Sequence, residues 1–110
     1  MTVYVVQEVP KFNISGALKY GNLTVILPPG NMSFSTDATY RKAAIGLKDF
    51  RKGDHLLLIG DPIAMGICFN IALALSGGNL TLLKWDRQTT SYIEVNVNIP
   101  RAIGERNENI

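Results

Sequence analysis

A short apolar run at residues 55–59, HLLLI, stands directly before Gly-Asp-Pro at residues 60–62, and this junction constrains the fold most strongly. Asp is a preferred helix N-cap, and Pro suits the first helical position because its missing N–H has no intrahelical partner to lose there. A helix is therefore predicted from residue 62 to about residue 76, where a glycine pair ends it. Residues 80–85 form another apolar strand, so the stretch predicts a strand–helix–strand unit with a right-handed parallel crossover.

The rest of the sequence extends this unit into one α/β domain. Strands are predicted over residues 2–9 and 23–27, and a helix follows the N-cap candidates at residues 35–37 until Gly53 ends it. Residues 92–99 alternate apolar and polar side chains, which is typical of a half-buried strand returning antiparallel at an edge. The order β-β-α-β-α-β-β predicts a mixed, mostly parallel sheet that resembles half of a Rossmann fold, with the position of the first strand left open.

Length and composition exclude several classes of protein. The 110 residues predict one domain over residues 1–99 and a polar, flexible tail over residues 100–110. One cysteine and one histidine exclude a disulfide framework and disfavour a structural zinc site. The net charge of +2 does not by itself indicate nucleic-acid binding. Because the sequence has neither a secretion signal nor an apolar stretch long enough to cross a bilayer, we expect a cytoplasmic protein without membrane contact.

The helix predicted over residues 62–76 is apolar on every side, whereas a helix lying on a sheet needs only one apolar stripe. Its outer side must be covered by the other helix, by residues 10–22, or by a second copy of the chain. The last alternative predicts a homodimer or larger oligomer with Met65, Phe69 and Leu73 in the interface.

Ligands of open α/β sheets bind outside the carboxyl ends of the parallel strands, where both predicted helices also begin. The segments that meet at this edge contain glycines, short polar side chains and one arginine that can hold an anion. These ligand-binding candidates are Gly30, Asn31, Ser33, Ser35, Gly60, Asp61 and Arg87. They could hold a nucleotide-class or phosphate ligand. Against this, Pro62 removes one N–H donor, Asp61 puts a negative charge at the helix start, and the sequence has neither a GxGxxG loop nor a Walker lysine.

Three carboxylates approach the same edge, and Asp37, Asp61 and Asp86 together could hold Mg²⁺ for phosphodiester hydrolysis. The alternative is that two of them cap helices and the third belongs to a turn. His55 opens a strand at the opposite end of the sheet, where we expect it at the surface without a serine or cysteine partner. Nucleophilic catalysis is therefore disfavoured, and no cofactor is expected unless the Mg²⁺ site exists.

Two surface features are candidates for contact with partners. Arg41, Lys48 and Lys52 would lie within about 40° of one another on the predicted first helix. This basic face is either solvated or contacts nucleic acid or an acidic protein. Trp85 and Tyr92 flank the predicted hairpin turn and should face each other across it.

Three stretches carry a resemblance to known sequences: YVVQEVP at residues 4–10, HLLLIGDP at residues 55–62 and LLKWDRQ at residues 82–88. They resemble short uncharacterised proteins encoded by tailed bacteriophages. The resemblance spans most of residues 4–98, implies a dispensable or host-directed accessory role, and assigns no site residues. Together with the residue patterns it favours a small, oligomeric, non-enzymatic protein that contacts a host protein through the hairpin of residues 82–92 or through the basic helix face. Nucleotide-class ligand binding or phosphodiester hydrolysis at the carboxyl edge of the strands is the alternative.

Overall fold

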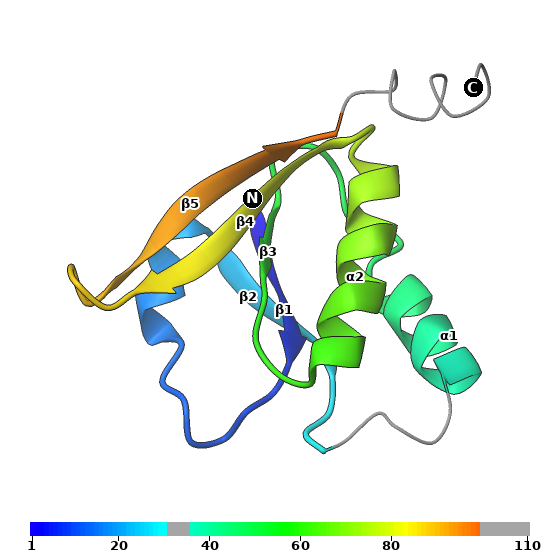
Figure 1. The fold of residues 1–110 in the computed structure, drawn as a ribbon, viewed down its shortest axis with the longest axis horizontal. Coiled ribbons are helices and arrows are strands. Elements are labelled where there is room, and N and C mark those ends of the chain that lie inside the picture. The colour runs from blue at the N-terminus through cyan, green and yellow to red at the C-terminus, as the bar shows by residue number, and fades with distance from the viewer. Residues whose placement is uncertain (31–35, 100–110) are drawn as a thin grey trace, which may run out of the picture.

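The computed structural model describes residues 1–30 and 36–99. Its elements (Figure 1) are β1 (Thr2–Gln7), the 3₁₀ helix η1 (Ser15–Tyr20), β2 (Asn22–Leu27), α1 (Thr36–Gly46), β3 (His55–Leu57), α2 (Pro62–Leu75), β4 (Asn79–Asp86) and β5 (Ser91–Asn98). The tail predicted at residues 100–110 lies outside the described residues.

The strands form one five-stranded sheet in the order β2-β1-β3-β4-β5. β1 to β4 run parallel, and β5 returns antiparallel to β4, so the predicted mixed, mostly parallel α/β fold is confirmed. The first strand, whose position the sequence left open, lies at the centre of the sheet. Its residues from Val3 to Gln7 are all buried, as expected for a strand covered on both faces.

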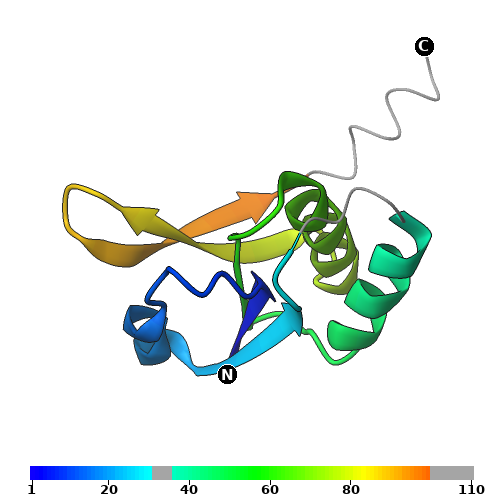
Figure 2. The same ribbon diagram turned by 90° about the horizontal axis from the view of Figure 1, so that it is seen from below.

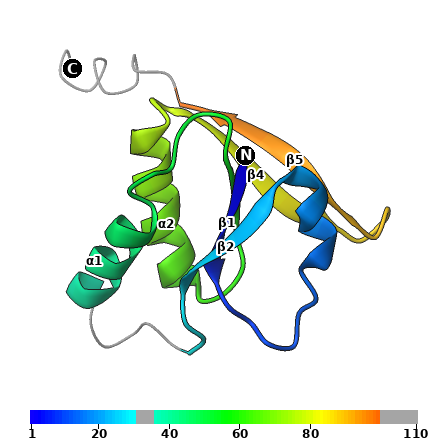
Figure 3. The ribbon, with the colours of Figure 1, turned by 180° about the vertical axis from the view of Figure 1, so that it is seen from behind.

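The two faces of the sheet are covered differently. Both α-helices pack on one face, against Val6 and Leu56, whereas η1 packs on the other, against Val5 and Leu57. Figure 3 shows η1 and the two helices on opposite sides of the strands. Since the connection after β1 crosses one face and the later connections cross the other, the winding changes direction between β1 and β3. The carboxyl ends of these strands are therefore the topological switch point, where ligands of open α/β sheets bind.

The predicted start and end of α2 are confirmed. The Asp61 carboxylate accepts a hydrogen bond from the Ile63 N–H at 2.8 Å, and Pro62 occupies the first turn. At the other end, Ser76 caps the helix and Gly77 takes a φ of +69°, a conformation that glycine adopts without steric cost.

Three predicted boundaries are wrong by two residues or more, and one of them is the end of β1, expected at residue 9 but found at Gln7. The first helix was expected to reach Gly53, but α1 ends at Gly46. Leu47 and Phe50 continue the apolar spacing beyond the helix and are buried in the same core, so the pattern identified core residues rather than helical ones. β3 has three residues and ends at Leu57, because the chain leaves the sheet there to reach the start of α2.

Of the predicted covers for α2, the other helix is found, and it covers one flank of α2. α1 packs directly beside α2, while η1 lies on the opposite face of the sheet and contributes nothing to covering the helix. Within residues 1–30 and 36–99, no helix combines the length and the apolar character needed to cross a membrane.

Candidate functional site at the carboxyl edge of the sheet

The unequal lengths of β3 and β4 open a gap at the carboxyl edge of the sheet. The ladder between these strands ends at the pair Leu57 and Leu83, whereas β4 continues to pair with β5 as far as Asp86. The last residues of β4, 84–86, are therefore paired with β5 but not with β3. Figure 2 shows the far end of this hairpin projecting away from the rest of the sheet.

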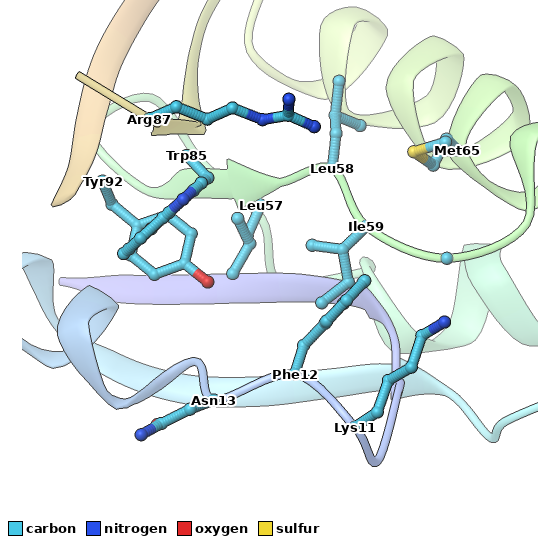
Figure 4. Close-up of a pocket in the computed structure, with 11 residues that line it drawn as sticks. Lys11, Phe12, Asn13, Leu57, Leu58, Ile59, Met65, Trp85, Arg87 and Tyr92 are labelled. Atoms are coloured by element: carbon cyan, nitrogen blue, oxygen red, sulfur yellow. The ribbon is translucent and has the colours of Figure 1, made fainter. Parts of the chain in front are cut away.

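A pocket of about 640 Å³ occupies this gap (Figure 4). Residues from four segments line it: the loop after β1, the end of β3, the first turns of α2 and the hairpin. We call it the hairpin pocket; its lining is Lys11, Phe12, Asn13, Leu57, Leu58, Ile59, Gly60, Met65, Trp85, Arg87 and Tyr92. Pockets of this size hold a drug-sized molecule, and most of the lining side chains are apolar.

Aromatic side chains form the wall on the hairpin side. Tyr92 is buried, and its ring meets the Trp85 ring edge-on, with ring centroids 5.0 Å apart, which confirms the predicted contact across the hairpin. The Tyr20 hydroxyl donates a hydrogen bond to the Tyr92 carbonyl at 2.7 Å and ties this wall to η1. Trp85 is packed against Tyr92 but remains 46% exposed, so its ring presents free surface to the pocket. Burial raises the pKa of Tyr92 above its ordinary value.

Two cationic side chains stand at opposite sides of the pocket. Figure 4 shows Arg87 beside Trp85 on the hairpin, and Lys11 across the gap beside Phe12. The Lys11 ammonium lies 5.4 Å from the centre of the Phe12 ring. Phe12 is 53% exposed, so its ring is free to contact a bound molecule. The pocket thus combines an apolar interior with a positively charged rim.

A smaller cavity of about 460 Å³ adjoins the hairpin pocket at the switch point and shares Lys11, Phe12 and Gly60 with it. Gln7, at the end of β1, borders this cavity with a side chain that is almost completely buried. Its Nε2 donates to the carbonyls of Pro28 and Gly30, and its Oε1 accepts from the Asp61 N–H at 2.7 Å. One amide at the end of β1 therefore links the loops that follow β2 and β3. Sequence reasoning missed this residue, since an isolated Gln in an apolar strand gives no local signal.

Residues 1–99 match the family model described as Phage Pam3 gp32-like protein. The chain belongs to this phage protein family. No curated protein and no solved structure matches this chain. Family membership confirms the resemblance to phage-encoded proteins noted from the sequence. It brings no assigned activity, so the geometry must carry any functional argument.

The ligand-binding candidates of this phage protein are divided between the two cavities. Gly30, Gly60 and Asp61 line the smaller cavity, and Arg87 lines the hairpin pocket together with Gly60. The remaining candidates, Asn31, Ser33 and Ser35, lie outside the described residues. Whether these residues bind a ligand stays a prediction.

The start of α2 is poorly suited to a phosphate. The N–H of Ile63 already donates to the Asp61 carboxylate, the N–H of Asp61 donates to Gln7, and Pro62 has no N–H. The Asp61 carboxylate also places a negative charge there, which repels an anion. An anionic ligand at this edge would therefore depend on the side chains of Arg87 and Lys11.

The three carboxylates considered for Mg²⁺ are not brought together. Asp61 caps α2, Asp37 lies in the first turn of α1, and Asp86 accepts hydrogen bonds from the Thr89 N–H and hydroxyl at 3.2 and 2.6 Å. The Thr89 hydroxyl lowers the pKa of Asp86, as expected for an acceptor in a turn. Among the described residues, no three His, Cys, Asp or Glu side chains are grouped to hold a metal. Asp61 therefore acts as a helix cap and Asp86 as a turn residue.

His55 is buried, and the expectation that it lies at the surface is wrong. Its Nε2 is 2.7 Å from the Glu94 Oε2 on β5, and its ring packs against Tyr20 with centroids 5.3 Å apart. The interaction depends on the strand order, which places β5 two strands away from β3. The side chains of His55 and Glu94 point to the same face of the sheet. His55 lies at the amino end of β3, so it does not belong to the hairpin pocket.

The basic face predicted on the first helix does not form. Arg41 is exposed on α1, but Lys48 and Lys52 follow the end of the helix at Gly46, so the three side chains do not share a helical face. A nucleic-acid contact along one helix consequently loses its geometric basis.

The residues proposed for an oligomer interface lie along one flank of α2. Met65, Phe69 and Leu73 recur at intervals of four residues, are partly buried and pack on the helix-side core. Met65 lines the hairpin pocket, so this flank faces the hairpin rather than α1.

Proposed function

We propose that this phage protein is a non-enzymatic accessory protein that binds an extended segment of a partner protein in the hairpin pocket. The segment would carry an apolar or aromatic side chain next to a carboxylate. A host protein is the partner expected of a phage accessory protein. The observation that carries the proposal is an apolar pocket with a cationic rim beside a strand edge that lacks a partner.

The strand edge supports a peptide as the ligand. Among the described residues, β4 beyond Leu83 pairs only with β5, so its other side offers backbone N–H and C=O groups to an added strand. Peptides that bind by strand addition take affinity from such backbone hydrogen bonds and specificity from pockets that accept alternate side chains. The hairpin pocket lies beside residues 84–86, where one side chain of an added strand would enter it.

The charge of the rim supports an acidic neighbour for that side chain. Arg87 and Lys11 stand on opposite sides of the pocket, and Arg pairs with a carboxylate through two parallel hydrogen bonds. The described lining contains no Asp, Glu, His, Cys or Ser side chain, so an acid, base or nucleophile could come only from Lys11 or Tyr92. This composition supports binding rather than catalysis.

A nucleotide-class ligand is the second candidate, because a base could stack on Trp85 or Phe12 while a phosphate meets Arg87. It is less favoured, since the N–H groups at the start of α2 are already bonded to Asp61 and Gln7.

Random peptides displayed on yeast and selected on the immobilised protein test the proposal. We expect enrichment of sequences with an aromatic or branched apolar residue next to Asp or Glu. Binding of a synthetic peptide with an enriched sequence should change the fluorescence of Trp85, the only tryptophan in the chain. Its affinity should fall at least about tenfold in Arg87→Ala, consistent with loss of a charge-assisted hydrogen bond.

Lys84→Ala is the matched control, because it removes an exposed cation from the same strand without touching the pocket. Peptides that bind Arg87→Ala and Trp85→Ala as tightly as wild type would contradict the proposal, as would a selection without enrichment. A rise in melting temperature with nucleoside phosphates that Arg87→Ala abolishes, without peptide enrichment, would favour the second candidate.

A further inference from the structure

The outer edge of β5 is long and unprotected. In the part of the chain that the structure describes, this eight-residue strand pairs with β4 alone. It contains no proline and a single charged residue, Glu94. Soluble proteins normally blunt such edges with charges, prolines or bulges, because unpaired N–H and C=O groups accept strands from other molecules.

The apolar side chains of β5 are concentrated on one face. Ile93, Val95 and Val97 lie on the same face as Leu82 and Leu80 of β4, their cross-strand neighbours being Lys84, Leu82 and Leu80. Leu80 and Leu82 pack in the helix-side core, but Ile93 and Val95 remain 38% and 36% exposed. The cover provided by α2 therefore ends at β4.

We propose that β5 pairs antiparallel with β5 of a second copy around a two-fold axis perpendicular to the sheet. The two sheets would join into one continuous sheet with its helices on the same face. A two-fold axis in this orientation keeps apolar side chains opposite apolar side chains, because residues that face each other in an antiparallel pair point to the same face.

The charge of Glu94 selects the register. Pairing over the greatest length places either Glu94 or Val95 on the axis. With Glu94 on the axis, two carboxylates would stand opposite each other, which is destabilising. With Val95 on the axis, residues 92–98 of the two strands pair, and Ile93 stands opposite Val97 of the partner subunit.

The polar face of β5 also fits this register, since Glu94 then stands opposite Asn96 of the partner subunit, with its Oε2 held by the His55 Nε2 and its Oε1 left to accept. Within each protomer, the Asn96 Oδ1 accepts from the Thr81 hydroxyl at 2.9 Å, which leaves the amide N–H₂ to donate. An amide donor facing a carboxylate is a favourable cross-strand pair. The oligomer contact predicted at Met65, Phe69 and Leu73 would then lie beside the paired β5 strands and not at the centre of the dimer interface.

The molar mass in solution, measured by sedimentation at tens of micromolar, tests the interface. Wild type should have twice the mass of one chain, and Val95→Lys should have half the wild-type mass, because the axis brings two lysines together. Val25→Lys is the matched control: Val25 is 43% exposed on the opposite edge strand, β2, so this variant should stay dimeric. Unchanged far-ultraviolet circular dichroism should accompany both substitutions.

Cysteine cross-linking tests the register independently of that variant. Val95→Cys should form an intermolecular disulfide on mild oxidation, because two copies of one position meet at the axis within bonding distance. Ile93→Cys alone should not, whereas a mixture of Ile93→Cys and Val97→Cys should. The buried native Cys68 should not interfere. A monomeric wild type, a dimeric Val95→Lys, or cross-linking through Val25→Cys instead of Val95→Cys would overturn the proposal.

Discussion

Replacing Gln7 with leucine tests whether one buried amide holds the carboxyl edge of the sheet together. The side chain is 2% exposed and joins the end of β1 to the two loops after β2 and β3: it donates to the carbonyls of Pro28 and Gly30 and accepts from the Asp61 N–H. Leucine has a similar volume but can make none of these bonds. The backbone of β1 should be unaffected, so the loss reports the amide alone.

The expected loss of stability follows from the three hydrogen bonds. Each contributes about 1 kcal/mol, and an N–H left without a partner in a partly buried position, here that of Asp61, costs about 1–3 kcal/mol. The apolar leucine side chain recovers part of this cost. We therefore expect unfolding free energy to fall by about 2–4 kcal/mol, and the melting temperature of a domain this size to fall by about 10–25 °C.

Urea unfolding followed by circular dichroism measures this loss, and the transition midpoint should fall without a change in slope. Gln88→Leu is the control, because Gln88 is exposed in the hairpin turn and should change stability by less than about 0.5 kcal/mol. A Gln7→Leu protein as stable as the control would refute the idea that the amide links the loops.

The glutamate substitution at the same position adds a pH test. In Gln7→Glu, the ionised carboxylate would face two carbonyl oxygens and could donate to neither. Folding should therefore raise the pKa of the introduced carboxyl. Such a group favours the folded state below its unfolded pKa of about 4.3, and this contribution is lost as pH rises through the folded value. Stability that did not decline relative to wild type between acidic and neutral pH would contradict this assignment.

Three further predictions concern other buried contacts. Burial raises the pKa of the Cys68 thiol to about 11, so iodoacetamide should leave this thiol unmodified in the native protein at mildly alkaline pH and alkylate it in guanidinium chloride. Mass spectrometry measures the alkylation, and rapid alkylation of the native protein would contradict the burial of Cys68. Glu94→Ala leaves the His55 Nε2 without its 2.7 Å partner and should lower unfolding free energy by about 1–3 kcal/mol, which equal urea midpoints would disprove. Gly46→Ala should destabilise the protein because the new Cβ would lie 2.8 Å from Ile26 Cγ2. Gly66→Ala has open space around the new Cβ and should stabilise α2 by about 0.5–1 kcal/mol. Thermal unfolding of the two variants tests whether the melting temperature falls in the first and rises in the second.

Much of the candidate site follows from local sequence. The turn at residues 60–62 and the hairpin after β4 place Gly60, Asp61 and Arg87 at the same edge as soon as the strands are parallel. The edge could therefore be predicted, and so could the contact between Trp85 and Tyr92. The pocket itself could not, because it exists only where β3 stops at Leu57 while β4 continues.

The wrong predictions share a cause. The helical spacing of Leu47 and Phe50 indicated correctly that they are buried, but a turn after α1 satisfies the same spacing. His55 was expected to be exposed because the residues beside it give no sign of Glu94, which is 39 positions away. A spacing pattern reports which side chains are apolar and not which distant segment will cover them.

The sequence by itself determined the order of strands and helices, the caps of α2 and the parallel crossovers, because backbone geometry and neighbouring residues decide these features. Tertiary structure alone decided that β1 lies at the centre, that Gln7 joins the loops after β2 and β3, and that His55 meets Glu94. Each of these depends on register between segments far apart in the chain. Neighbouring residues do not specify which distant segments pair, so these contacts cannot be predicted from a local pattern.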